Sequence, residues 1–264
     1  MSLEQQLDER GVFTLRLDRT DKRNAIDDEM MTALLDAFTR AGVDEAVRTV
    51  VLEGAGEHFC GGADIVARNT EERERRPRAG SIQRRVPTQA HRLIPLVAGV
   101  QVPVVCKVRG WASGIGFQLA LAADVCIAAR DARFWEPFAE RGFTPDSGAT
   151  WLLPRRVGEV RARELLLLGR VLSGEEAAEW GAIHAAVDAA GLDAAVDDIA
   201  ARLASGPTVA LGLTKWLLHE GAQASLGAHL ADEAFALELS SRTDDFREGL
   251  AAFREKRPPR FTGR

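Results

Sequence analysis

The sequence predicts an α/β fold in the first part of the chain and an all-helical region at its end. In the first part, short apolar runs typical of buried strands alternate with stretches of helical apolar spacing. After about Leu192 the spacing is helical throughout, and no linker rich in Pro or Ser and no fixed-period repeat interrupts the 264 residues. We therefore expect a core over residues 1–191 and a helical C-terminal region over residues 192–264.

The order of the elements justifies this fold class. Residues 12–18 alternate between apolar and polar side chains, as a half-buried strand does. Asp27 can cap a helix over about 28–41, and an apolar strand follows at 49–53. A strand, a helix and a second strand begin a right-handed α/β winding. We expect later strands at 104–108, 124–129 and 182–187, and helices at 93–100, 134–142, 160–168, 174–180, 192–204, 207–220, 225–239 and 244–256.

Composition and charge restrict the function classes. The chain is 46% hydrophobic and 28% charged, which is typical of a soluble globular protein. Its net charge of −5 lacks the basic excess of a nucleic-acid-binding protein, and no apolar run is long enough to span a bilayer. Residues 1–6 do not resemble a secretory signal, and Cys60, Cys106 and Cys126 indicate reduced, buried thiols. We expect a cytoplasmic protein with no metal site, nucleic-acid partner or membrane partner.

Two glycine-containing turns follow apolar strands. Residues 104–120 contain a strand, a turn with Gly110 and Gly114, and a helix of small residues beginning near Gly114. Such a turn serves packing alone, or it aims unpaired helix N–H groups at a developing negative charge on an oxygen. Residues 58–65 repeat the arrangement after the strand at 49–53. Two such turns in one chain favour a two-donor oxyanion hole.

Three ordered motifs resemble the crotonase, or enoyl-CoA hydratase/isomerase, superfamily. They are Asp-Lys-Arg-Asn-Ala at 21–25, Phe-Cys-Gly-Gly-Ala-Asp at 59–64 and Gly-Trp-Ala-Ser-Gly-Ile-Gly at 110–116. The resemblance runs from about Val12 to Arg264, and the tail over 208–264 resembles the phenylacetate-pathway enoyl-CoA isomerases. It implies a crotonase-like spiral of ββα units forming two sheets. It also implies that the helical C-terminal region builds a homotrimer, which can pair into a hexamer.

The resemblance also implies the substrate and the residues that bind it. The substrate would be an acyl-CoA thioester, with coenzyme A as part of the substrate and no separate cofactor. The backbone N–H groups of Ala63 and Ile115 would polarise the thioester carbonyl, so that an enolate can form. The other residues expected at the substrate are Lys22, Arg23, Ala25, Gly61, Asp64, Ile65, Gly114, Gln118 and Phe138.

The sequence departs from the hydratases at two positions. Their two glutamates fall, by register, on Gln118 and Phe138. Gln118 can hydrogen-bond a water molecule but cannot take its proton, and Phe138 can do neither. Glu136 and Glu140 flank Phe138, but a short helix there would point them to other faces. The usual two-carboxylate hydration is therefore not expected.

Asp146 is the remaining candidate for proton transfer. By residue physics it is either an N-cap of the next helix or an acid/base group. Residues 145–148, Pro-Asp-Ser-Gly, match the element that supplies the acid/base aspartate in the phenylacetate-pathway isomerases. The resemblance therefore implies an isomerase that moves a double bond between the β,γ and α,β positions of an enoyl-CoA.

Two other functions remain open. In chlorobenzoyl-CoA dehalogenases the position of Asp146 supplies a nucleophile, with an aromatic residue at the position of Phe138 and a histidine near the position of His91. An aryl-CoA dehalogenase or related hydrolase is therefore one alternative, and a non-catalytic acyl-CoA-binding protein is the other. The arginine-rich residues 66–92 form either a solvated surface or a lid whose cations face the coenzyme A phosphates.

Overall fold

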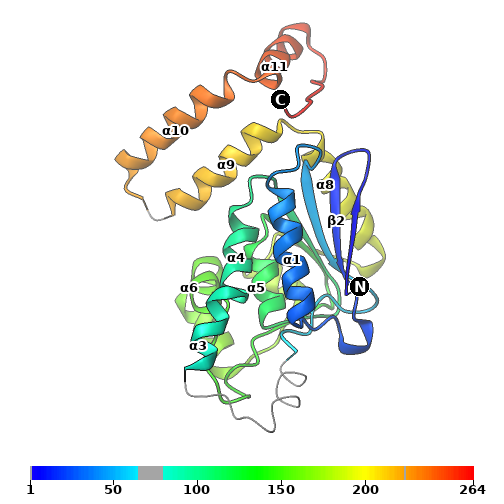
Figure 1. Cartoon of the computed structure of the whole chain (residues 1–264), viewed down its shortest axis with the longest axis vertical. Helices are drawn as coiled ribbons and strands as arrows, with labels where there is room; N and C mark the ends of the chain where they lie inside the picture. Colours follow the sequence, from blue (N-terminus) through cyan, green and yellow to red (C-terminus); the bar gives the residue numbers. More distant parts are fainter. Residues whose placement is uncertain (1, 65–79, 223) are drawn as a thin grey trace.

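The computed structural model describes residues 2–64, 80–222 and 224–264. A large sheet runs through the middle of the molecule (Figure 1). Its strands, in spatial order, are Leu3–Leu7 (β1), Val12–Leu17 (β2), Thr49–Gly54 (β3), Val104–Val108 (β4), Val125–Ala129 (β6) and Ala185–Val187 (β9). β1 is antiparallel to β2, and the remaining neighbours are parallel. The α/β prediction is confirmed.

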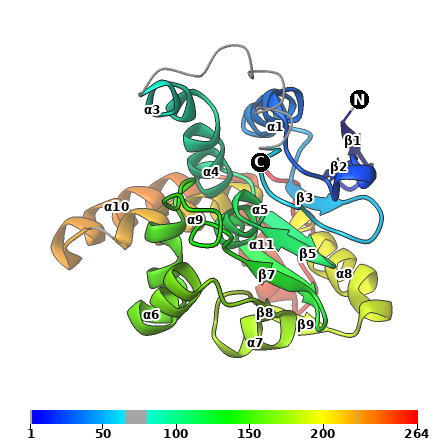
Figure 2. The same cartoon turned by 90° about the horizontal axis from the view of Figure 1, so that it is seen from below.

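A smaller sheet contains Trp111–Ser113 (β5), Arg133–Trp135 (β7) and Leu172–Ser173 (β8), which lie side by side in Figure 2. The chain passes from β4 in the large sheet to β5 in the small one and then into the helix Ile115–Ala122 (α5). It repeats this passage from β6 to β7 and, after a loop, into Ala149–Leu168 (α6). These repeats are the ββα units that the resemblance implies.

Helices cover both sides of the large sheet. Asp28–Ala41 (α1), Ala90–Gly99 (α4) and α5 lie on one side, and Leu192–Ala204 (α8) lies on the other (Figure 1). The first five residues of β3 are therefore buried along both faces, as in other covered parallel sheets. Asp27 caps α1 as expected, since its Oδ1 accepts from the N–H of Met30 at 2.8 Å. The other short helices of the described residues are Thr20–Lys22 (η1), Ser81–Arg85 (α3), Val86–Thr88 (η2), Gly174–Glu179 (α7) and Ala189–Gly191 (η3).

Two expected helices differ in the structure. The helix expected over 134–142 is wrong, because Phe134 belongs to β7 and the following residues form turns. The helix expected at 160–168 begins earlier, at Ala149, and Gly158 interrupts it with φ 77°. Apolar spacing alone does not separate a short strand with turns from a short helix.

The helical C-terminal region continues from α8 into Thr208–Gly221 (α9), Leu226–Ser240 (α10) and Asp244–Glu255 (α11), which extend beyond the body of the molecule (Figure 1). Lys215 anchors α9, since its buried ammonium lies 2.7 Å from the carboxylate of Asp124. These helices expose large apolar side chains: Leu218, Leu226, Leu230, Phe235, Leu237, Leu239, Phe246, Leu250 and Phe253. In the part of the chain that the structure describes, no helix is both long and apolar enough to cross a membrane.

Candidate active site

The two glycine turns lie side by side. The N–H of Cys60 donates to the carbonyl of Trp111 at 2.8 Å, and the N–H of Ser113 donates to the carbonyl of Cys60 at 2.9 Å. A β-carbon on Gly116 would lie 2.7 Å from Cβ of Cys60, so glycine is required where α5 approaches the first turn. Burial raises the pKa of the Cys60 thiol to about 12, which keeps it protonated and unreactive. Cys60 therefore acts in packing.

Each turn contains a backbone N–H group, at Ala63 and at Ile115, that has no acceptor among the described residues. In the first turn, the carbonyl of Gly62 and the N–H of Asp64 both pair with Ile26, and the N–H of Ala63 between them stays unpaired. In the second turn, Ile115 is the first residue of α5, whose leading N–H groups have no partner within the helix. The structure thus brings Ala63 and Ile115 together as two free donors.

Ala63 and Ile115 line the same pocket, which has a volume of about 60 Å³. The pocket lies between the two turns, the start of α4 and the loop that leads to α6. Asp146 is its only carboxylate among the described lining residues. The lining residues are Met31, Gly62, Ala63, Val86, Gln89, Ala90, Gly114, Ile115, Pro137, Phe138, Arg141, Phe143, Asp146 and Ser147.

The side chain of Asp146 does not cap α6. The helix begins after Gly148, at φ 86°, and no side chain accepts from its first N–H groups. The carboxylate of Asp146 instead accepts from Oγ of Ser147 at 2.9 Å. Ser147 is itself left-handed, with φ 52°, so the chain turns sharply here. The capping interpretation is therefore wrong, and the exposed carboxylate is left at the pocket.

Aromatic side chains form one wall of the pocket. Phe138 is buried, and its ring meets the ring of Phe143 edge to face, with centroids 5.5 Å apart. The guanidinium of Arg141 lies 5.6 Å from the ring of Trp135 and also borders the pocket. Phe138 thus lines the pocket, its role at the substrate stays a prediction, and Arg141 adds one cation to the lining.

Gln118 is not among the residues that line the pocket. It is fully buried, and its Nε2 donates to both carboxyl oxygens of Glu136, at 2.7 and 2.9 Å. Burial raises the pKa of Glu136 well above its ordinary value. Sequence reasoning missed Glu136 because the expected helix over 134–142 turned it to another face. The signal available in the sequence was that Glu136 lies two positions after the buried strand residue Phe134, on the same side of an extended chain.

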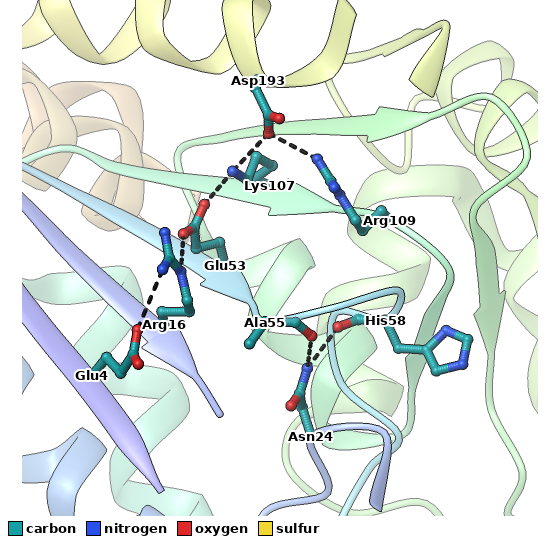
Figure 3. Close-up of polar contacts among 9 residues, drawn as sticks. All are labelled: Glu4, Arg16, Asn24, Glu53, Ala55, His58, Lys107, Arg109 and Asp193. Carbon is teal, nitrogen blue, oxygen red and sulfur yellow. Dashed lines mark hydrogen bonds and ion pairs between the residues drawn. The ribbon is translucent and has the colours of Figure 1, made fainter. Parts of the chain in front are cut away.

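The residues expected near coenzyme A form a second cluster beside the first turn. Arg23 and Asn24 are both left-handed, with φ 51° and 57°, and the N–H of Gly61 donates to the carbonyl of Arg23 at 2.7 Å. Nδ2 of Asn24 donates to the carbonyls of Ala55 and His58, which fixes the loop before that turn (Figure 3). Lys22 ends η1 in the same segment.

Arg19 connects the same two segments. Its guanidinium donates to the carbonyl of Ala25 at 2.6 Å and pairs with the carboxylate of Asp64 at 2.9 Å. The structure therefore brings together Lys22, Arg23, Ala25, Gly61 and Asp64 in one region. Ile65, and the arginines between residues 68 and 78, lie outside the described residues.

An ion-pair network supports the strands that carry the two turns (Figure 3). Glu53 of β3 is buried and pairs with Arg16 of β2 and with Lys107 of β4. Lys107 and Arg109 each lie 2.8 Å from the carboxylate of Asp193 on α8. The network therefore ties α8 to neighbouring strands of the large sheet. Among the described residues, no three His, Cys, Asp or Glu side chains gather as a metal site.

Comparison with known proteins supplies the family. A family model described as enoyl-CoA hydratase/isomerase matches residues 8–264. The chain is 40% identical to a 1,2-epoxyphenylacetyl-CoA isomerase from Escherichia coli K12, over 97% of each chain. It is 33% identical to 4-chlorobenzoyl coenzyme A dehalogenase-1 from an Arthrobacter species, over 93% of this chain and 88% of that one.

Solved structures agree with the fold. A crystal structure of an enoyl-CoA hydratase from Bacillus anthracis matches the whole of both chains with a TM-score of 0.91 and 31% identity. The names of these relatives cover three different reactions, so similarity by itself leaves the reaction open. The match over nearly the full length, together with the two paired turns, establishes that this chain belongs to the enoyl-CoA hydratase/isomerase family.

Proposed function

We propose that the protein is an enoyl-CoA isomerase that uses Asp146 as its acid/base group. The observation that supports this proposal is that one carboxylate, Asp146, lines the same pocket as two free backbone donors, Ala63 and Ile115. The two positions that hold carboxylates in hydratases are an amide, Gln118, and an aromatic ring, Phe138. One carboxylate suffices to move a proton between two carbons of the same substrate, whereas the usual hydration uses two.

The chemistry follows from this arrangement. The thioester oxygen accepts hydrogen bonds from the N–H groups of Ala63 and Ile115, and each such donor is worth about 3–4 kcal/mol in other enzymes. This polarisation acidifies the carbon next to the carbonyl. Asp146 removes a proton from one end of the allylic system and returns it to the other end, so the double bond shifts. No water is consumed, and Asp146 ends the cycle ionised as it began.

The coenzyme A portion has a separate region to bind to. We propose that the backbone around residues 22–25 and 61–64 borders it, because these segments lie together beside the Ala63 turn. Arg84 and Arg85 end α3, directly before the pocket residue Val86, and offer cations for the phosphates. Coenzyme A is then part of the substrate.

The aromatic wall favours an acyl group that carries a ring. Phe138 and Phe143 present an edge-to-face pair, a geometry that also suits a third aromatic ring. The relative from Escherichia coli is named for a phenylacetyl-CoA derivative, which supports the same class. The dehalogenase alternative has less support, because His91 is exposed on α4 and does not line the pocket.

Isomerisation in deuterated water tests the proposal. A β,γ-enoyl-CoA should become its α,β isomer and gain deuterium at the carbon that receives the proton, without net hydration or thioester hydrolysis. A 3-hydroxyacyl-CoA as the main product, halide release from an aryl-CoA, or binding without turnover would each contradict it.

A further inference from the structure

A fully buried carboxyl lies next to two pocket residues and has no cationic partner in the part of the chain that the structure describes. Glu136 directly precedes Pro137 and Phe138, which line the pocket, yet its own side chain is 0% exposed. Nε2 of Gln118 donates to both of its oxygens. Among the described residues no Lys, Arg or His forms an ion pair with Glu136 or acts on its charge. An unpaired carboxylate in such a place would be very costly.

Charged groups in the adjoining loop face elsewhere. Glu140 lies against Gly169, where a β-carbon would come within 3.2 Å of its Oε1. The guanidinium of Arg141 stacks over the ring of Trp135 at 5.6 Å. Neither compensates the charge of Glu136.

Charged groups on the neighbouring helices do not compensate the charge of Glu136 either. The helix α5, which carries Gln118, has no titratable side chain. Arg156 of α6 donates to the carbonyl of Leu121 at the far end of α5. Asp146 is the charged group that acts on Glu136. Burial raises the pKa of Glu136, the hydrogen bonds from Gln118 lower it by less, and the negative charge of Asp146 raises it further.

The contact between Gln118 and Glu136 is also compatible with a neutral carboxyl. Among the described residues, Oε1 of Gln118 is buried and has no hydrogen-bond partner, and rotation of the amide would place Nε2 there instead. The nitrogen and oxygen of an amide are assigned from their hydrogen bonds, so the amide can equally be rotated. A protonated Glu136 can then donate to Oε1 of Gln118, which an ionised carboxylate cannot do.

We propose that Glu136 is a positioning residue, the protonated member of a carboxyl pair with Asp146. It holds Gln118, and through it α5 with the Ile115 amide, while Asp146 remains the one anionic carboxylate at the thioester. These separate roles of Glu136 and Asp146 rest on the proposed function, whereas the protonation of Glu136 does not. Two carboxyls whose surroundings separate their protonation states are a recurring basis for acid/base chemistry.

Stability against pH is the first test. The raised pKa means that the folded protein holds a proton on Glu136 that the unfolded chain loses above about pH 4.5. Wild type is therefore stabilised at low pH and loses this stability as the pH rises toward the folded-state pKa. Between the unfolded-state and folded-state pKa values of Glu136, the unfolding equilibrium constant of wild type divided by that of Glu136→Gln should rise about tenfold per pH unit. Glu140→Gln is the control, and a ratio for Glu136→Gln that is independent of pH would overturn the proposal.

Infrared spectroscopy is the second test, and its main readout comes from wild type itself. Wild type should show a protonated-carboxyl C=O stretch at neutral pH, and Glu136→Gln should remove it. As the pH is raised, the band should disappear at a lower pH in Asp146→Asn than in wild type, because the negative charge that raises the pKa of Glu136 is gone. Absence of the band from wild type at neutral pH would overturn the proposal. If the band disappeared at the same pH in Asp146→Asn as in wild type, the pairing of the two carboxyls would be overturned.

The third test separates positioning from packing. Glu136→Ala removes the partner of Gln118 and should lower kcat while KM stays close to wild type, and Glu136→Gln should restore kcat. Wild-type kcat in Glu136→Ala would overturn the positioning role. If wild type itself does not isomerise enoyl-CoA, the proposed function fails, but the pH and infrared results still decide the state of Glu136.

Discussion

Gly116 packs directly against Cys60, so that a single β-carbon at position 116 would lie 2.7 Å from Cβ and 2.8 Å from the carbonyl oxygen of Cys60. This contact joins the helix that presents the Ile115 amide to the turn that presents the Ala63 amide. The distance between the two donors therefore depends on the absence of a side chain at position 116.

Gly116→Ala should separate the two turns. Because a backbone oxygen cannot move aside cheaply, we expect a loss of about 1–3 kcal/mol in the free energy of unfolding. A displacement of about 1 Å at a donor can cost roughly 100-fold in rate, so kcat/KM should fall far more than stability alone explains. Gly227→Ala, on exposed α10 with open space around it, is the matched control and should not lose stability. Wild-type kinetics in Gly116→Ala would contradict the two-donor site.

Asp146→Asn should abolish proton transfer and leave the fold intact. The carboxylate does not cap α6, so its loss should leave the melting temperature near that of wild type. Removal of a lone acid/base group should lower kcat roughly 100- to 10,000-fold. Affinity for acyl-CoA should survive because the Ala63 and Ile115 amides are unchanged. Asp131→Asn, on an exposed residue between β6 and β7, is the control. Full turnover in Asp146→Asn would remove Asp146 from the mechanism.

Restoring two carboxylates should introduce hydration. Gln118→Glu with Phe138→Glu places glutamates where hydratases have them, but a carboxyl at position 118 would then face Glu136. Two buried carboxyls this close cannot both ionise, and Glu136→Gln removes the competition for the charge, so it should increase the gain. We expect the triple variant, assayed with a short enoyl-CoA, to hydrate faster than wild type and faster than the double variant. Efficient hydration of crotonyl-CoA by wild type would show that Gln118 and Phe138 are misinterpreted.

Binding of acyl-CoA should weaken as salt is added. The proposed phosphate contacts come from exposed or partly exposed cations such as Arg84 and Arg85, whose attraction is screened by ions. Calorimetry with an unreactive acyl-CoA at increasing salt measures the effect. The double variant Arg84→Gln with Arg85→Gln should bind more weakly at low salt and show a smaller salt dependence. Binding that does not depend on salt would place the phosphates elsewhere.

Assembly into a homotrimer is the last prediction. The C-terminal helices expose apolar side chains, including Phe235, Leu237 and Phe253, that a monomer would leave in water. Light scattering at micromolar concentration should give three times the chain mass, or six times if trimers pair. Phe235→Ser with Leu237→Ser should lower that mass, whereas Val43→Ser, on an exposed residue of the core, should not. A monomeric wild type would contradict the prediction.

The sequence by itself determined the α/β class, the inner strands of the large sheet and most of the helices, because apolar periodicity and capping residues act over a few neighbouring positions. It did not predict the strands of the smaller sheet. Asp27 before α1 and the glycines before α5 are such local signals, and the structure confirms the elements they predict. The motifs at 21–25, 59–64 and 110–116 were sufficient to identify the family. The boundary at residue 192 stays a prediction, and α8, which begins there, packs on the large sheet.

Only the tertiary structure decided which side chains face the pocket. Asp146 has the sequence of a cap, but left-handed backbone at Ser147 and Gly148 moves the start of α6 past it. Glu136 and Gln118 are 18 residues apart, and they meet because β5, which leads into the helix of Gln118, pairs with β7, which ends just before Glu136. Contacts of this kind depend on how sheets and helices pack together, and no local pattern in the sequence records that packing.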